Sequence, residues 1–272
     1  MDNSEPKKIL PFLKWAGGKR WLVEKHSIFL EASHDRFIEP FLGSGAVYFS
    51  LKPTKAILCD KNERLIEAYS AIKENWPGVL RHLKIHHSKH SKEYYYSVRS
   101  KKVRTPETRA AQFIYLNRTC WNGLYRVNLE GRFNVPIGTK QNVILDTDDF
   151  ESVSKLLGGA ELVSGDFEYA ISQARSGDFV FVDPPYTVKH NYNGFVKYNE
   201  SIFSWEDQLR LRDSVKAATS RGAKVLVTNA CHESIRDIYE GVGELVVVDR
   251  ASVIAGKSVA RGRYEEMVIK CF

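Results

Sequence analysis

The chain has 272 residues, of which 43% are hydrophobic and 27% charged, as is typical of a soluble globular protein. That length allows one α/β domain with an insertion, or two domains. No apolar run approaches the length of a membrane span, and the polar amino terminus has no signal-peptide core. Four scattered cysteines argue for a reducing compartment, and against a disulfide framework or a Cys-based metal site. We therefore expect a cytoplasmic protein that has no membrane partner.

The positive charge of the chain is concentrated in its middle. The net charge is +7, and residues 81–118 contain ten Lys or Arg against two acids. A basic region attached to a nearly neutral body indicates a polyanion partner. The alternative is a basic surface that is only solvated.

The first half of the chain starts as alternating strands and helices and then changes character. Apolar runs predict strands at residues 37–41 and 56–60, each followed by a helix. The segment 62–118 is rich in basic residues, His and Tyr, and its pattern is mostly helical. From residue 121 to 136, two glycines and a proline indicate loops and short strands.

Strands alternate with helices again after about residue 150. Strands are predicted at 161–163, 179–182 and 224–229, an amphipathic helix at 205–220, and a closing hairpin from 245–248 and 267–269. This alternation predicts a parallel, doubly wound α/β sheet. We expect residues 1–62 and 150–272 to form the sheet domain, and residues 63–149 to be an insertion within it.

The turn after residues 178–182 is the most informative feature of the sequence. Pro184 and Pro185 cannot donate to a sheet ladder, so they end the strand and hold a stiff turn. The turn presents the Asp183 carboxylate before the prolines and the Tyr186 ring after them. Together these groups suit a flat base that carries an amino group. The alternative is a Pro-rich strand end with a solvated Asp.

A glycine-rich turn from strand to helix lies earlier, at residues 39–45. Gly43 and Gly45 permit a tight turn and a close approach of a ligand to the backbone. Asp60 ends the next strand, about where an acid would bond ribose hydroxyls. The third glycine of the dinucleotide fingerprint is missing, because Tyr48 stands in its place. The pattern therefore disfavours a nicotinamide cofactor and keeps an adenosine-containing ligand open.

Two further segments have less specific patterns. Residues 12–19 combine aromatic residues, glycines and a cation, and either close over an amino-acid or phosphate group or form a mobile basic leader. Four histidines at 82, 86, 87 and 90 have no cysteine beside them. We expect solvated or phosphate-facing histidines there and no metal.

Taken together, the ordered motifs of this chain resemble those of the DNA adenine methylase (Dam) family. These are S-adenosylmethionine-dependent enzymes that methylate N6 of adenine. The resemblance runs from about residue 11 to 269. The matching motifs are Lys14-Trp15-Ala16-Gly17-Gly18-Lys19, Glu39-Pro40-Phe41 with Gly43 and Gly45, Asp60, Asn122-Gly123-Leu124, Phe133-Asn134-Val135-Pro136 and Asp183-Pro184-Pro185-Tyr186.

The resemblance implies a role for each matching position. It implies cofactor contacts from Trp15, Ala16, Gly17, Lys19, Glu39, Pro40, Phe41, Gly43, Gly45, Asp60, Asp166 and Asp183. It implies a catalytic turn formed by Asp183, Pro184, Pro185 and Tyr186. It implies DNA contacts from Lys14, Trp121, Asn122, Leu124, Arg126, Asn134 and Pro136. Cys120 and Tyr125 depart from the family pattern, which leaves the recognition sequence open.

The fold and function that the resemblance implies are specific. The fold is a Rossmann-like class I methyltransferase sheet, mostly parallel with a closing antiparallel hairpin, and an inserted, mainly helical target-recognition domain. We expect methyl transfer from S-adenosylmethionine to a flipped-out adenine in double-stranded DNA, most plausibly within GATC, without a metal. We also expect a monomer in the cytoplasm of a prokaryote or from a phage. The alternatives are a catalytically silent DNA-binding protein, and a methylase that acts on RNA or on protein glutamine.

Overall fold

The computed structural model describes residues 8–128, 131–188, 203–251 and 263–272. The chain divides into two compact units, each built from several segments. The first unit comprises Met1–Val23, Leu42–Thr54 and Asp60–Gly165, and the second comprises Glu24–Phe41, Lys55–Cys59 and Asp166–Phe272. None of the helices in the described ranges is long and apolar enough to cross a membrane.

Within the described residues, seven strands form one sheet in the order β3-β2-β1-β4-β5-β7-β6. The strands are β1 (Arg36–Glu39), β2 (Ala56–Asp60), β3 (Ala160–Ser164), β4 (Asp178–Val182), β5 (Lys224–Ala230), β6 (Glu244–Ala251) and β7 (Arg263–Cys271). β1 pairs in parallel with β2 and β4, and β4 pairs in parallel with β5. β7 runs antiparallel to both β5 and β6. The prediction of a mostly parallel sheet that ends in an antiparallel hairpin is therefore confirmed.

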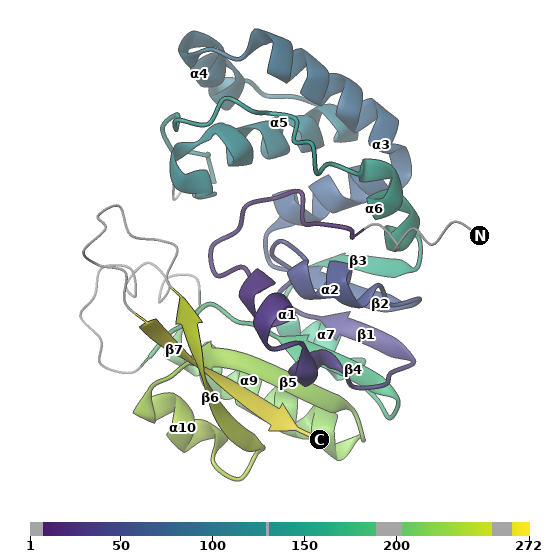
Figure 1. Cartoon of the computed structure of the whole chain (residues 1–272), viewed down its shortest axis with the longest axis vertical. Coiled ribbons are helices and arrows are strands. Elements are labelled where there is room, and N and C mark those ends of the chain that lie inside the picture. The colour runs from purple at the N-terminus through teal and green to yellow at the C-terminus, as the bar shows by residue number, and fades with distance from the viewer. Residues whose placement is uncertain (1–7, 129–130, 189–202, 252–262) are drawn as a thin grey trace. The chain divides into compact units, whose positions relative to one another are not determined.

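Burial explains why the central strands read as apolar runs. All five residues of β4 are buried, as is usual for a strand that is covered on both faces. Helices of the second unit supply one of these covers. They are α7 (Phe167–Ser172), α9 (Trp205–Ser220) and α10 (Glu233–Tyr239). α9 packs against β5 and also contacts α7 and α10, so the three helices line one face (Figure 1).

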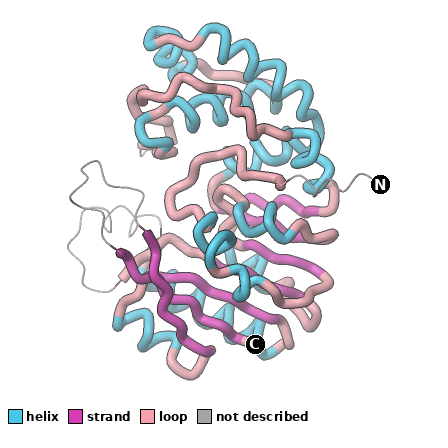
Figure 2. Tube along the Cα trace, viewed as in Figure 1, coloured by secondary structure: helices cyan, strands magenta, loops and turns pink. Residues whose placement is uncertain are grey.

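The first unit is mainly helical, as Figure 2 shows by colour. Its helices are α2 (Ala46–Leu51), α3 (Glu63–Lys89), α4 (Lys92–Ser100), α5 (Pro106–Thr119), the 3-10 turn η2 (Trp121–Gly123) and α6 (Phe150–Leu157). Two short pieces, α1 (Arg20–Lys25) and the 3-10 turn η1 (Ser27–Leu30), come before β1. α3 breaks its helical geometry at Asn75, because Pro77 cannot donate to the preceding turn. α5 lies alongside α3 and is buried over its last ten residues, so it forms the core of this unit (Figure 1).

The compact units and the predicted domains divide the chain differently. Gly43, Gly45 and Asp60 belong to the same compact unit as the helices of the predicted insertion. The prediction from the sequence instead assigned residues 1–62 to the sheet domain, because their motifs resemble those of the cofactor-binding domain. The helical character of the middle is as predicted, and the functional division at residues 62 and 150 stays a prediction.

Candidate active site

The glycine turn in the first unit has the geometry that its sequence predicts. Gly43 and Gly45 have φ of 48° and 65°, in the left-handed region that favours glycine. A Cβ at Gly43 would lie 2.8 Å from Cδ1 of Trp15, so a side chain at this position would displace the indole. The Gly43 N–H donates to Oδ2 of Asp60 over 3.0 Å, and the hydroxyl of Tyr69 donates to the Gly43 carbonyl over 3.2 Å. The turn, the acid and the indole therefore lie together.

Asp60 is the last residue of β2, as predicted. Its other oxygen, Oδ1, accepts from the N–H of Asn62 over 2.9 Å. Burial raises the pKa of this carboxyl above its usual value, and the two backbone N–H bonds only partly oppose that effect. A half-buried carboxylate that is fixed at a strand end is well placed to accept hydrogen bonds from hydroxyl groups.

The segment of Lys14 and Trp15 is fixed to the end of α5. The Lys14 N–H donates to Oδ1 of Asn117 over 2.9 Å, and Nδ2 of Asn117 donates back to the Lys14 carbonyl over 2.7 Å. Lys19 is buried, and its Nζ donates to the Gly17 carbonyl over 3.0 Å. The loop between them, Ala16 and Gly17, is exposed. These bonds disfavour the alternative of a mobile basic leader for this segment.

The segment after α5 carries the residues that were predicted to contact DNA. Trp121 is 53% exposed, and its N–H donates to the Pro136 carbonyl over 2.9 Å. Bridges between Val127 and Phe133 and between Cys120 and Ile137 make it a short, irregular hairpin. Nε of Arg126 donates to Oδ1 of Asn134 over 2.9 Å across this hairpin. We call residues 121–136 the recognition loop.

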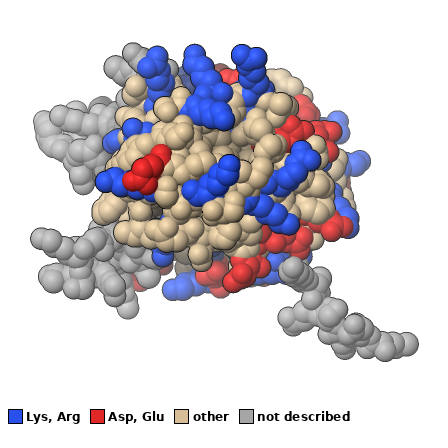
Figure 3. Space-filling model, turned by 90° about the horizontal axis from the view of Figure 1, so that it is seen from above, with Lys and Arg blue, Asp and Glu red and all other residues tan. Residues whose placement is uncertain are grey.

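The basic segment 81–118 is only partly a free basic surface. Lys and Arg side chains spread over the face in Figure 3, whereas acids gather mainly toward its right and lower margins. Seven of the ten cations are exposed, namely Arg81, Lys84, Lys89, Lys92, Lys101, Lys102 and Arg104. Arg118 is 1% exposed and forms a bidentate pair with Asp148, with both distances 2.6 Å. Arg109 pairs with Glu67. These two arginines therefore serve the packing of the first unit.

Two of the histidines of this segment, His86 and His90, meet tyrosine hydroxyls. Nδ1 of His86 lies 3.0 Å from the hydroxyl of Tyr94, and Nδ1 of His90 lies 2.8 Å from that of Tyr115. The expectation of solvated or phosphate-facing side chains is wrong for these two histidines, because tyrosine hydroxyls on α4 and α5 lie within hydrogen-bond distance of their Nδ1 atoms. Within the described residues, no group of three or more His, Cys, Asp or Glu could hold a metal ion.

The Asp-Pro-Pro-Tyr turn lies in the second unit, directly after β4. Oγ1 of Thr228 donates to Oδ1 of Asp183 over 2.8 Å. The hydroxyl of Tyr186 donates to Oε2 of Glu266 over 2.7 Å. Burial, and then the charges of Asp183 and Glu266, hold the pKa of Tyr186 well above its usual value. The tyrosine therefore stays a neutral hydroxyl at neutral pH.

Buried amides hold the turn from behind. Nε2 of Gln208 donates to the carbonyls of Pro185 and Thr187, over 3.5 and 3.4 Å. Oε1 of Gln208 in turn accepts from Nδ2 of Asn229 over 3.1 Å. Asn229 thus supports the turn through Gln208. Pro184 itself is buried.

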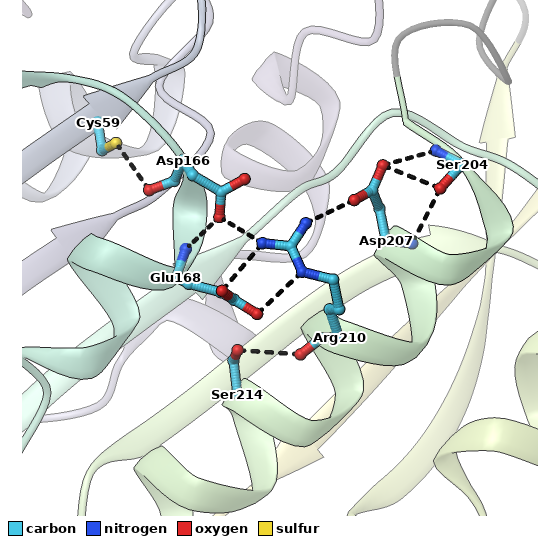
Figure 4. A network of polar contacts seen from close by, with 7 residues as sticks. All are labelled: Cys59, Asp166, Glu168, Ser204, Asp207, Arg210 and Ser214. Carbon is cyan, nitrogen blue, oxygen red and sulfur yellow. Dashed lines mark hydrogen bonds and ion pairs between the residues drawn. The ribbon is translucent and has the colours of Figure 1, made fainter.

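Asp166 caps the start of α7 and belongs to a charged network that is centred on Arg210 (Figure 4). Its Oδ1 accepts from the N–H of Glu168 over 3.0 Å and from Arg210 over 3.1 Å. Arg210 also pairs with Glu168 and with Asp207, over 2.9 and 2.6 Å. The single guanidinium of Arg210 therefore offsets part of the negative charge of three carboxylates, and it fixes the position of the Asp166 carboxylate.

Phe41 and Glu39 complete the predicted residues of the second unit. The Phe41 ring stacks on Phe167 with centroids 5.4 Å apart, and it meets Phe203 edge-on at 5.6 Å. Glu39 and Pro40 are buried at the end of β1. The guanidinium of Arg210 lies 5.0 Å above the centre of the Phe167 ring, so the charged network and the aromatic cluster are in contact.

The predicted site residues thus form one group in each compact unit. The first unit holds Lys14, Trp15, Ala16, Gly17, Lys19, Gly43, Gly45, Asp60 and the predicted residues of the recognition loop, and the second holds Glu39, Pro40, Phe41, Asp166 and the four residues of the Pro-Pro turn. Sequence reasoning missed the polar partners that fix them. These are Tyr69, Asn117, Arg210, Thr228 and Glu266. The sequence signal for Glu266 was weak, an acid placed directly before the apolar run at 267–269.

The parallel sheet with an antiparallel end, together with the helical insertion, is a class I methyltransferase-like α/β fold. A family model described as D12 class N6 adenine-specific DNA methyltransferase matches residues 15–253, and the chain belongs to this family. The resemblance to DNA adenine methylases is thereby confirmed.

Relatives cover almost the whole chain. The type II methyltransferase M1.LlaDCHI of Lactococcus lactis subsp. cremoris is 37% identical, in an alignment that covers 96% of this chain and 95% of the relative. The type II methyltransferase M.MjaIII of Methanocaldococcus jannaschii is 35% identical over 96% of this chain and 99% of its own length. The DNA adenine methylase of Escherichia coli K12 is 30% identical over 96% and 95%. The protein is an adenine-specific DNA methyltransferase.

Enzymes of this family take their methyl group from S-adenosylmethionine. The first unit has a donor and acceptor set that fits this molecule. The Asp60 carboxylate, held by the Gly43 N–H, is of the type that accepts hydrogen bonds from ribose hydroxyls, and a glycine at position 43 would let a ligand approach the backbone beside the Trp15 ring. Trp15, Gly43, Gly45 and Asp60 would hold the adenosine portion. The bound cofactor supplies an electrophilic methyl group on a sulfonium.

Proposed function

We propose that this enzyme methylates adenine N6 within GATC in double-stranded DNA. One observation supports the readout of a guanine in this site, the bond between Arg126 and Asn134 on the recognition loop. A bond at Nε leaves the two terminal nitrogens of Arg126, which suit the paired acceptors O6 and N7 of guanine. Exposed cations such as Lys101 and Lys102 contact phosphates, which position the DNA without reading its sequence.

The target adenine must leave the duplex to be methylated, at a cost of a few kcal/mol. Trp121 is large and exposed, and it would fill the gap in the base stack. The Asp183 carboxylate and the Pro184 carbonyl would accept from the N6 amino group, while Tyr186 stacks on the base. The bond from Thr228 fixes the Asp183 carboxylate in advance. Acceptors that are fixed in this way stabilise the positive charge that develops on nitrogen during attack.

The cofactor contacts proposed from the first unit are Trp15, Ala16, Gly17, Lys19, Gly43, Gly45 and Asp60. Those proposed from the second unit are Glu39, Pro40, Phe41, Asp166 and Asp183. Lys14, Asn122, Leu124, Asn134 and Pro136 complete the proposed DNA contacts. The exposure of Lys14, Asn122, Asn134 and Pro136 supports this assignment.

We assign catalysis to residues 1–62 and 150–272, and target recognition to residues 63–149. The enzyme acts as a monomer in a prokaryotic or phage-infected cytoplasm, on the nucleoid. The sources of the relatives support this setting, because they include a bacterium, an archaeon and Escherichia phage P1.

Transfer of labelled methyl from S-adenosylmethionine to matched duplexes tests the recognition sequence. A duplex with one GATC should accept label, and duplexes with one altered base pair should accept much less. Arg126→Ala should reduce that discrimination by about 1–3 kcal/mol, or roughly 5- to 150-fold. Lys102→Ala is the control, and it should weaken binding to all duplexes alike. An Arg126→Ala enzyme that loses affinity equally for every sequence would show that Arg126 contacts phosphate.

A further inference from the structure

The indole of Trp15 joins two parts of the first unit that serve different ligands in the proposed function. It lies against the glycine turn, since a Cβ at Gly43 would be 2.8 Å from its Cδ1. The same indole stacks on Tyr125 of the recognition loop, with ring centroids 6.0 Å apart and planes at 18°. A single side chain therefore contacts both the proposed cofactor turn and the DNA-reading loop.

Tyr125 extends this contact into the loop and into the core of the unit. The centroid of its ring lies 4.6 Å from the ring centroid of Phe113 on α5 and 5.3 Å from that of Phe133. Phe133 bridges to Val127, the residue that follows Arg126. The position of the Trp15 ring is thus connected by packed aromatic side chains to both strands of the hairpin that presents Arg126.

The residue before Trp15 provides a second connection to the same loop. Asn117 holds the backbone of Lys14 by two hydrogen bonds. Gly123 packs closely on the Lys14 side chain, because a Cβ there would lie 2.7 Å from Cδ of Lys14. Lys14 is therefore fixed to the end of α5 and packs on the loop that follows it, directly beside Trp15.

We propose that Tyr125 is a positioning residue that makes cofactor and DNA bind cooperatively, an inference that rests on the proposed function. A cofactor held beside Trp15 restricts the indole, and through the stack it restricts Tyr125 and the hairpin. DNA that binds afterwards has less of the loop left to order, so it binds more tightly. Linkage requires that DNA tighten cofactor binding by the same factor.

Calorimetry with S-adenosylhomocysteine, in the presence and absence of duplex, measures this factor. The duplex is chosen because the wild-type enzyme methylates it. If the recognition sequence is not GATC, a duplex with the true sequence is used, and the coupling can still be measured. We expect the duplex to tighten S-adenosylhomocysteine binding by about tenfold in the wild type, within the usual range of such coupling. Tyr125→Ala should reduce the factor to less than about twofold. Tyr125→Phe keeps the ring and should keep the coupling.

Two controls separate coupling from loss of folding. Tyr169→Ala removes an exposed tyrosine of α7 in the second unit and should leave the factor unchanged. Tyr125→Leu keeps apolar volume beside Phe113 without the aromatic face, and it should lose coupling while unfolding at nearly the wild-type temperature. The proposal is overturned if the wild type shows no coupling. It is equally overturned if Tyr125→Leu weakens both ligands separately while the factor between them persists.

Discussion

The hydroxyl of Tyr186 donates to Oε2 of Glu266, which lies 80 residues further along the chain and is 3% exposed. The bond fixes the far end of the ring. Glu266 belongs to β7, whose pairing with β5 brings it opposite Ala230. An aromatic ring with a buried acidic partner is thus part of the turn that was recognised from four consecutive residues.

The first prediction separates the ring of Tyr186 from its hydroxyl. Tyr186→Ala should weaken productive binding of the target base by about 1–3 kcal/mol, because stacking is lost. Tyr186→Phe keeps the stacking face and should lose much less. Methylation rates at saturating cofactor, measured against DNA concentration, test both variants. Equal losses in the two would show that the hydroxyl and not the ring is required.

The second prediction concerns stability in mild acid. Burial first, and then the charges of His82 and Lys101, lower the pKa of His86 to about 4. The unfolded chain takes up this proton below its ordinary pKa of 6.5, whereas the folded chain resists it. The stabilisation from His86 is therefore complete above pH 6.5 and is lost as the pH falls from there toward 4. The slope for one proton reaches about 1.4 kcal/mol per pH unit.

Urea unfolding across this pH range checks the effect. His86→Phe should lower the slope by up to one proton, since it keeps the ring contact with Tyr115 and removes the titration. His87→Phe, at an exposed neighbouring position, should leave the slope unchanged. A His86→Phe protein with the wild-type slope would assign the proton uptake to other groups.

The third prediction distinguishes the buried arginine of the basic segment from the exposed ones. Arg118 pairs with Asp148 and also donates to the carbonyls of Phe12 and Val143. Arg118→Ala should destabilise the fold by about 3–5 kcal/mol, because it leaves a buried carboxylate without its partner. Arg104→Ala, at an exposed position, should change the free energy of unfolding by less than about 0.5 kcal/mol. A stable Arg118→Ala protein that binds DNA weakly would reverse this assignment.

The fourth prediction addresses the network in Figure 4. Arg210→Gln removes the cation shared by three carboxylates and one of the donors that fix Asp166. We expect a several-fold weaker affinity for S-adenosylmethionine, with the largest loss at low salt, where carboxylate repulsion is least screened. Arg212→Gln on the same helix is the matched control, because Arg212 pairs with the adjacent Asp213. Similar affinities of the two variants would separate Arg210 from cofactor binding.

Local patterns predicted most of the sheet and of the helices around it. The strand before the Pro-Pro turn and the helix at 205–220 were predicted within one residue of their bounds. Both have strong local causes, a continuous apolar run in one and a Ser204 capping box followed by an amphipathic pattern in the other. The conformations of Gly43 and Gly45 follow from the same kind of local constraint.

Partners distant in sequence could not be predicted in this way. The bond between Tyr186 and Glu266 depends on the register of β7, which no short pattern specifies. Arg118 looked like one more cation of a basic segment, because its acidic partner lies 30 residues away. His86 and His90 looked solvated for the same reason, since the tyrosines that meet them come from later helices.

The position of β7 also has a consequence for the order in which the protein folds during synthesis. β7 is translated last among the seven strands, yet it lies between β5 and β6 and pairs with both. Until residues 263–271 leave the ribosome, β5 and β6 each present an unpaired edge, which other nascent chains can join. Glu266 arrives with β7, so its bond to Tyr186 cannot form until this strand is in place. A chain that stops before β7 would leave both edges unpaired, and we expect it to aggregate.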